Sequence, residues 1–81
     1  MLSNVKTNDY LIVKMAGEDD TFFGKVIDRS IWYNSLIITI LYYRGFEVQY
    51  TERGKRISDP RWSITEVQII DETQYKLITS G

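Results

Sequence analysis

The run from residue 35 to residue 43, Ser-Leu-Ile-Ile-Thr-Ile-Leu-Tyr-Tyr, constrains the fold of this chain more than any other stretch. It is the most apolar run in the sequence, and its isoleucines and threonine are β-branched, which suits a pleated strand better than a helix. Alternate side chains of a strand point to opposite faces, and here both sets are mostly apolar. The run therefore predicts a strand covered on both faces, at the middle of a small, strongly curved sheet.

Shorter runs on both sides of this strand predict the neighbours that wrap around it. Their composition and alternation are typical of strands bounded by turn residues. They cover residues 10–15, residues 22–27 (which residues 31–33 would lengthen), residues 46–52, residues 67–70 and residues 75–78. Five or six short strands in 81 residues predict one all-β domain over residues 1–81, a meander closed into a small barrel.

The expected core lies on one face of the central strand and of the strands beside it. Gly24, inside the second strand, is expected to be a backbone requirement, since an interior strand glycine usually marks a bulge or a close backbone approach. Gly45 is expected to supply a positive φ in an Arg44-Gly45 hairpin turn. The residues expected to face the core are Leu36, Ile38, Ile40, Val26, Phe46, Val48 and Tyr50.

The segment near the only proline predicts a short helical turn. Ser63-Ile64-Thr65-Glu66 matches the capping-box pattern, in which the first and fourth side chains satisfy backbone N–H groups at a helix start. Only a few residues remain before the next strand begins. The sequence therefore predicts a single turn near residues 63–66, of α or 3₁₀ type.

Four features follow one another in an order known from a family of small barrels. Asp9-Tyr10-Leu11-Ile12-Val13-Lys14 resembles the opening strand of SH3-like barrels of the Tudor, Agenet and KOW type. Phe23-Gly24-Lys25-Val26 is similar to their second strand, and residues 62–70 are similar to their closing helical turn and last strand. The resemblance spans roughly residues 8–70 and implies an SH3-like barrel. Tudor-type domains bind methylated side chains and KOW-type domains bind RNA or proteins. The residues that match these families imply neither activity for this chain.

The composition argues against an enzyme. Without histidine or cysteine, the usual nucleophilic triads and thiolate metal sites are impossible, and the five glycines are too scattered for a phosphate loop. Asp19-Asp20 and Asp71-Glu72 are paired carboxylates suited to a hard cation or acid–base work, but acidic turns in solvent are commoner. We therefore predict no catalytic residue, cofactor or metal. The chain lacks a signal-peptide pattern and a membrane-length apolar run, which predicts a cytoplasmic protein without membrane contact.

The aromatic residues are the most informative candidates for a binding site. Several are adjacent pairs in strands, so one ring of each pair can face the core and the other can face a partner. The resemblance to SH3-like barrels implies that Trp62 lies between the acidic residues 18–20 and the basic residues 53–61, as an apolar anchor flanked by both charges. The candidate partner-binding residues are Trp62, Trp32, Tyr43, Asp19, Asp20, Arg53, Lys55, Arg56 and Arg61.

These residues are compatible with three functions. The first is a non-enzymatic module that binds a protein, of which a phage-type accessory protein that inhibits a host factor is one form. The second is single-stranded nucleic-acid binding, because a basic segment lies near strand aromatics. A net charge of −1 argues against a protein built mainly to coat nucleic acid. The third is a structural homo-oligomer in which an uncovered strand pairs with a neighbour.

Overall fold

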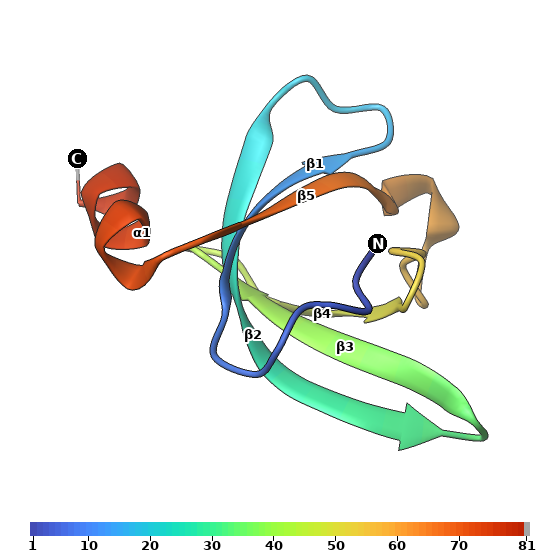
Figure 1. Cartoon of the computed structure of the whole chain (residues 1–81). Coiled ribbons are helices and arrows are strands. Elements are labelled where there is room, and N and C mark those ends of the chain that lie inside the picture. The colour runs from blue at the N-terminus through green and yellow to red at the C-terminus, as the bar shows by residue number, and fades with distance from the viewer. Residues whose placement is uncertain (81) are drawn as a thin grey trace.

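Figure 1 shows the computed structural model, which describes residues 1–80. Five strands form one antiparallel sheet in the order β4-β3-β2-β1-β5, so the all-β prediction is confirmed for most of the chain. The elements in chain order are β1 (Tyr10–Met15), β2 (Thr21–Trp32), β3 (Ser35–Tyr42), β4 (Glu47–Thr51), the 3₁₀ turn η1 (Pro60–Trp62), β5 (Ile64–Ile70) and the helix α1 (Glu72–Thr79).

The apolar run that opened the sequence analysis forms β3, which pairs with β2 on one side and β4 on the other. Ile38 and Ile40 are fully buried, as is Val26, which lies opposite Ile40 on β2. Val48 and Tyr50 of β4 are also buried, whereas Leu36 is only partly buried against the core. The core predicted around the central strand is therefore confirmed, with the exception of Phe46.

Residues before β1 complete this core. Leu2 and Val5 are fully buried, and the Leu2 N–H donates to the carbonyl of Glu52 over 2.8 Å. The Asn8 N–H donates to the carbonyl of Val26 over 2.7 Å, which ties the segment to β2. The opening segment thus contributes large side chains to the interior, a role that its sequence pattern did not predict.

The C-terminal segment contradicts the prediction of a last strand. Residues 75–78 do not form a strand but lie within α1. The Asp71 side chain accepts a hydrogen bond from the Gln74 N–H, and the Gln74 side chain accepts one from the Asp71 N–H. This reciprocal capping box starts a helix where the short apolar pattern suggested a strand. Tyr75 stacks on Tyr10 with ring centroids 4.6 Å apart, which docks the helix on β1.

The predicted helical turn at residues 63–66 is also wrong in position. The turn is η1, where Pro60 fixes a helical φ and the Asp59 side chain accepts a hydrogen bond from the Arg61 N–H. Ser63 ends the turn, and Ile64 already pairs with Met15 of β1. Pairing with β1 therefore overrides the local capping-box pattern of Ser63 to Glu66.

The β3–β4 turn differs from the prediction in two details. Arg44, rather than Gly45, has the positive φ, at 57°. The Gly45 N–H donates to the carbonyl of Tyr42 over 3.1 Å, so the turn spans Tyr42 to Gly45. Phe46 therefore lies outside β4 and is 69% exposed, which contradicts its expected place in the core.

Candidate binding groove

A cavity of about 430 Å³ opens between three segments that are distant in the sequence. The β1–β2 connection, the β3–β4 turn and η1 each contribute side chains to it. We call it the Trp62 groove, and it is lined by Met15, Glu18, Phe22, Tyr42, Tyr43, Arg44, Gly45, Phe46, Val48, Arg56 and Trp62. Two larger hollows of about 460 and 700 Å³ have no aromatic side chain in their walls. The Trp62 groove is therefore where the aromatic residues converge.

The floor of the groove is a set of packed rings. Phe22 meets Tyr42 edge to face with centroids 6.4 Å apart, and Tyr42 meets Tyr50 in the same way at 6.5 Å. The hydroxyls of Tyr42 and Tyr50 form a buried hydrogen bond of 2.7 Å. Burial raises the pKa of both hydroxyls above the ordinary value, so both keep their protons to a higher pH than an exposed tyrosine does. These contacts give the floor a fixed shape.

The walls of the groove carry three aromatic side chains that solvent reaches. Phe46 is 69% exposed, Tyr43 is 40% exposed and Trp62 is 37% exposed. The Tyr43 hydroxyl donates to the carbonyl of Thr79 over 2.7 Å, and the Arg44 guanidinium lies 5.2 Å from the centre of the Tyr43 ring. The Tyr43 ring is thus held in place from two sides, next to an apolar surface that the fold leaves open.

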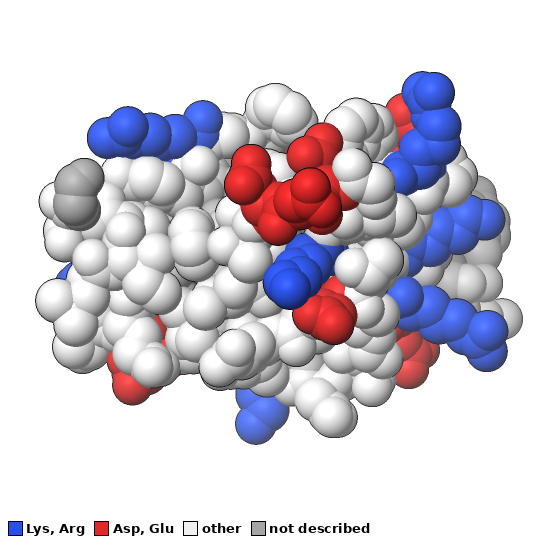
Figure 2. Space-filling view, turned by 90° about the horizontal axis from the view of Figure 1, so that it is seen from above, with Lys and Arg blue, Asp and Glu red and all other residues white. Residues whose placement is uncertain are grey.

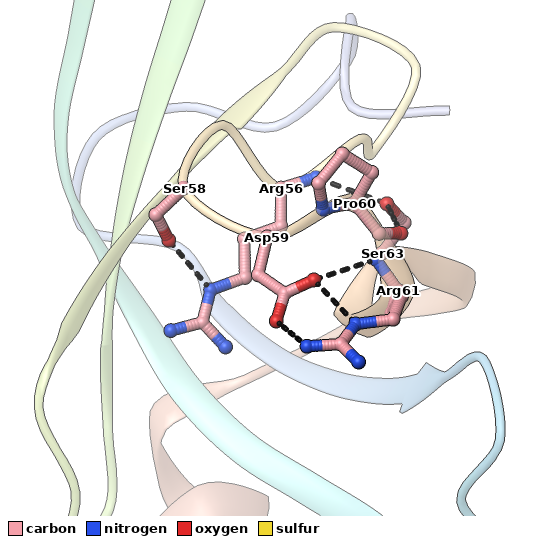
Figure 3. Close-up of polar contacts among 6 residues, drawn as sticks. All are labelled: Arg56, Ser58, Asp59, Pro60, Arg61 and Ser63. Carbon is pink, nitrogen blue, oxygen red and sulfur yellow. Dashed lines mark hydrogen bonds and ion pairs between the residues drawn. The ribbon is translucent and has the colours of Figure 1, made fainter.

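Charged side chains of both signs border this apolar surface. Glu18 lies in the β1–β2 wall, whereas Arg44 and Arg56 come from the opposite segments. The Arg56 Nε donates to the Ser58 Oγ over 3.1 Å, as Figure 3 shows. In the face shown in Figure 2, acidic side chains gather near the centre, with Lys and Arg side chains around them. With Glu18 on one side and Arg44 and Arg56 on the other, the lining residues give the groove a rim of mixed charge above its aromatic floor.

Two side chains of the basic segment, Arg56 and Arg61, are engaged with their own neighbours. Arg61 donates from two guanidinium nitrogens to the two carboxylate oxygens of Asp59, at 3.1 and 3.0 Å (Figure 3). These hydrogen bonds lower the pKa of the Asp59 carboxyl and raise the pKa of the Arg61 guanidinium. The pair lies at the surface, with the Arg61 side chain 86% exposed and the Asp59 side chain 29% exposed, and it neutralises one of the cations that a phosphate would contact. Nucleic-acid binding stays a prediction.

The candidate residues from the sequence divide into two sets. Trp62, Tyr43 and Arg56 line one groove, while Arg61 and Trp62 line a smaller hollow with Ala16 and Gly17. Trp62 is therefore beside the β1–β2 loop, as expected. Outside the groove lining, Asp19 and Asp20 are exposed next to Glu18, Lys55 and Arg53 are exposed after β4, and Trp32 is 63% exposed at the β2–β3 hairpin.

Most of the lining residues lie outside the candidate set, among them Phe46, Phe22 and Arg44. Phe46 was assigned to the core by alternation and Arg44 to the hairpin turn, while Phe22 belonged to an adjacent aromatic pair whose outward ring was not assigned. The β3–β4 turn was the available signal, because a turn that ends at Gly45 leaves Phe46 outside the strand. The other two residues join the groove only through tertiary packing, which a local pattern does not contain.

One of the two carboxylate pairs, Asp71-Glu72, has a local structural role. Asp71 caps α1, and Glu72 forms an ion pair of 3.0 Å with Lys76 one turn later. Within residues 1–80, no three acidic side chains gather in a way that would hold a metal ion. No helix in the same range is both long enough and apolar enough to cross a membrane.

Comparison with protein-family models, curated proteins and solved structures found no match for this chain.

Proposed function

We propose that this protein is a non-enzymatic binding module that takes a short segment of a protein partner into the Trp62 groove. The observation that carries the proposal is the convergence of Phe46, Tyr43 and Trp62 around one cavity while all three stay accessible to solvent. Aromatic side chains at the centre of an apolar patch are the groups that supply most of the free energy in protein interfaces. A small protein that exposes them together has a surface suited to a partner.

The rim suggests the chemistry of the segment that binds. Arg44 and Arg56 favour an acidic residue on their side, and Glu18 favours a basic residue on the other. An apolar or aromatic anchor between those two charges would fill the cavity. The rim charges would mainly set the orientation of the segment, and the anchor would supply the affinity.

We further infer that the sheet curls into an SH3-like barrel that presents this groove at one end. The strand order and the 3₁₀ turn between β4 and β5 support this reading. A hydrogen bond of 2.8 Å from the Ile64 N–H to the Gly54 carbonyl also links the chain after β4 to the first residue of β5. Amide hydrogen exchange tests the barrel, because closure predicts strong protection of the Ile64 N–H.

Selection from a displayed library of random peptides tests the binding proposal without knowledge of the natural partner. We expect enriched peptides to share one large apolar residue flanked by an acidic residue on one side and a basic residue on the other. Trp62→Ala and Phe46→Ala should lose the selected peptides, whereas Trp32→Ala removes an exposed tryptophan from a distant hairpin and serves as the matched control. Failure to enrich any peptide, or equal loss in all three variants, would reject the groove as the binding site.

A further inference from the structure

The second half of β2 runs beyond the strand that flanks it. β1 pairs with β2 only from Thr21 to Lys25, and two hydrogen bonds between Val26 and the residues before β1 extend this contact by one position. From Asp28 to Trp32, β2 pairs with β3 alone. Within residues 1–80, no backbone hydrogen bond reaches the other side of this stretch. Figure 1 shows it projecting at the outside of the molecule. We call it the open β2 edge.

The other strand of this part of the sheet is protected differently. The outer side of β4 is covered by the segment that follows it, where the Thr51 N–H donates to the Lys55 carbonyl over 2.9 Å. The Ile57 N–H also donates to the Gln49 carbonyl over 3.1 Å. Unpaired edges tend to recruit another strand, and proteins usually cover them or place charges along them. Among residues 1–80, no segment covers the open β2 edge in this way. The edge carries two exposed charged residues, Asp28 and Arg29, and then two exposed apolar residues, Ile31 at 73% and Trp32 at 63%.

The hairpin turn fixes which backbone groups point outward from this edge. Tyr33 and Asn34 both have positive φ, 48° and 65°, and form a two-residue turn that closes on the Trp32–Ser35 pair. In such hairpins the closing pair is hydrogen-bonded, and hydrogen-bonded pairs alternate along the ladder. Trp32 and Ser30 therefore use their backbone groups toward β3. Arg29 and Ile31 direct their N–H and C=O groups to the open side.

We propose that the open β2 edge pairs with the same edge of a second copy of this chain, antiparallel, about a two-fold axis at Ser30. Arg29 of each copy would exchange two backbone hydrogen bonds with Ile31 of the other. The register is self-complementary because the outward-facing residues are two positions apart, with one residue between them on the axis. Any antiparallel edge can pair with itself in this way, so the choice of a second copy rests on the side chains that this register brings together.

The side chains along the edge suit this register. Ser30 is small, so the two strands can approach at the axis, where directly opposed side chains lie closest. Ile31 would lie beside the aliphatic part of Arg29 of the second copy. The Arg29 guanidinium donates to the Ser3 carbonyl over 3.2 Å, which leaves other nitrogens of the group free for a neighbour. The contact is on the order of half of the ~800 Å² per partner in a standard interface, so the dimer is weak and concentration-dependent.

Two substitutions at Ile31 should affect self-association differently, and each serves as the control for the other. Both remove the same apolar side chain from a position that is 73% exposed, so both should leave the fold intact. Ile31→Lys places a cation opposite Arg29 of the second copy and should weaken self-association at least tenfold. Ile31→Glu places an anion there and should keep it within about threefold of the parent. Sedimentation equilibrium from micromolar to millimolar protein measures both, with circular dichroism to verify folding.

A cysteine at the axis tests the register directly. The chain contains no cysteine, so Ser30→Cys introduces a single thiol. Opposed residues of a non-hydrogen-bonded antiparallel pair lie near the separation that a disulfide bridges. We expect Ser30→Cys to form a disulfide dimer at least tenfold faster than Asn34→Cys, an exposed residue in the hairpin turn. A parent that stays monomeric throughout, equal weakening by Lys and Glu, or equal cross-linking of the two cysteine variants would each overturn the proposal.

Discussion

Replacing Gly24 with alanine tests the packing between β2 and β3 at its tightest point. A Cβ at this position would lie 2.6 Å from the Cγ2 methyl of Ile40 and 3.1 Å from both the Leu41 carbonyl oxygen and a ring carbon of Tyr42. Gly24 is not among the residues with positive φ, so the backbone conformation itself permits an alanine. Any loss of stability would therefore come from overpacking and not from backbone strain.

The expected size follows from two opposing effects. Forcing one extra carbon into a packed core costs about 1–3 kcal/mol, and replacing glycine recovers about 0.4–1 kcal/mol by restricting the unfolded chain. Taken near the middle of their ranges, the two effects leave a net loss of about 1–2 kcal/mol. With a urea dependence near 1 kcal/mol per molar for a chain of this size, the unfolding midpoint should fall by about 1–2 M.

Double variants identify the methyl group responsible. Ile40→Leu removes the branched Cγ2 methyl that the new Cβ would contact, so Gly24→Ala should cost less in that background. Ile40→Val retains the same methyl and should give no rescue. Urea unfolding of the single and double variants measures the coupling. A midpoint for Gly24→Ala at or above the parent, or equal rescue by leucine and valine, would refute the contact as the cause.

Four further outcomes are expected. Ile40→Ala should lower the free energy of unfolding by about 2–5 kcal/mol, because Ile40 is fully buried; an unchanged midpoint would contradict its place in the core. Burial raises the pKa of Tyr42 and Tyr50, so the folded state resists their ionisation. The free energy of unfolding should therefore keep its full value below about pH 10 and fall as the pH rises above it. Urea midpoints from pH 8 to 11.5 measure this, and a Tyr42→Phe/Tyr50→Phe variant should have the flatter profile. Trp62→Ala should weaken binding of a selected peptide by on the order of 2 kcal/mol with the fold retained, as calorimetry and circular dichroism would show; unfolding would instead identify Trp62 as a core residue. Asp71→Ala should reduce protection of the α1 amides from hydrogen exchange while leaving β3 unchanged, since it removes the helix cap; unaltered α1 protection would count against the capping box.

The strands could be predicted because their signals are local. Residues 35–43 carry enough β-branched residues to specify β3, and the alternation from Val48 to Tyr50 specifies the inward face of β4. The positions of Leu2 and Val5 could not be predicted in the same way. They are two isolated apolar residues, and their burial depends on where the chain passes over the sheet.

The two helical errors have a common cause. The sequence contains two capping-box patterns, one starting at Ser63 and one at Asp71. The first lies where β1 offers a pairing edge to Ile64, so a strand forms there. The second follows the last pair of that ladder, Tyr10 with Ile70, and meets no competing strand among residues 1–80. The same local pattern therefore gave opposite structures because tertiary pairing was available to only one of them.

Only part of the candidate site could be predicted from the sequence, for a similar reason. Trp62 could be identified because a tryptophan beside a proline turn is difficult to cover, and its charged neighbours are visible in the sequence. Phe22 and Arg44 join it from positions about forty and twenty residues earlier in the sequence, and only the folded sheet brings them together. The groove is thus a property of the packing, although its central anchor is a property of the sequence.

The two proposed surfaces are separate, and this has a consequence for affinity. The open β2 edge, residues 28–32, shares no residue with the lining of the Trp62 groove. Pairing at the edge would therefore leave both grooves of a dimer free. A partner that carries two binding segments would then bind the dimer with an enhanced apparent affinity, while a single peptide would not sense the dimer. Ile31→Lys should accordingly weaken binding to a surface dense in immobilised peptide but leave the affinity for soluble peptide unchanged. Loss of both affinities would show that the edge and the groove are not independent.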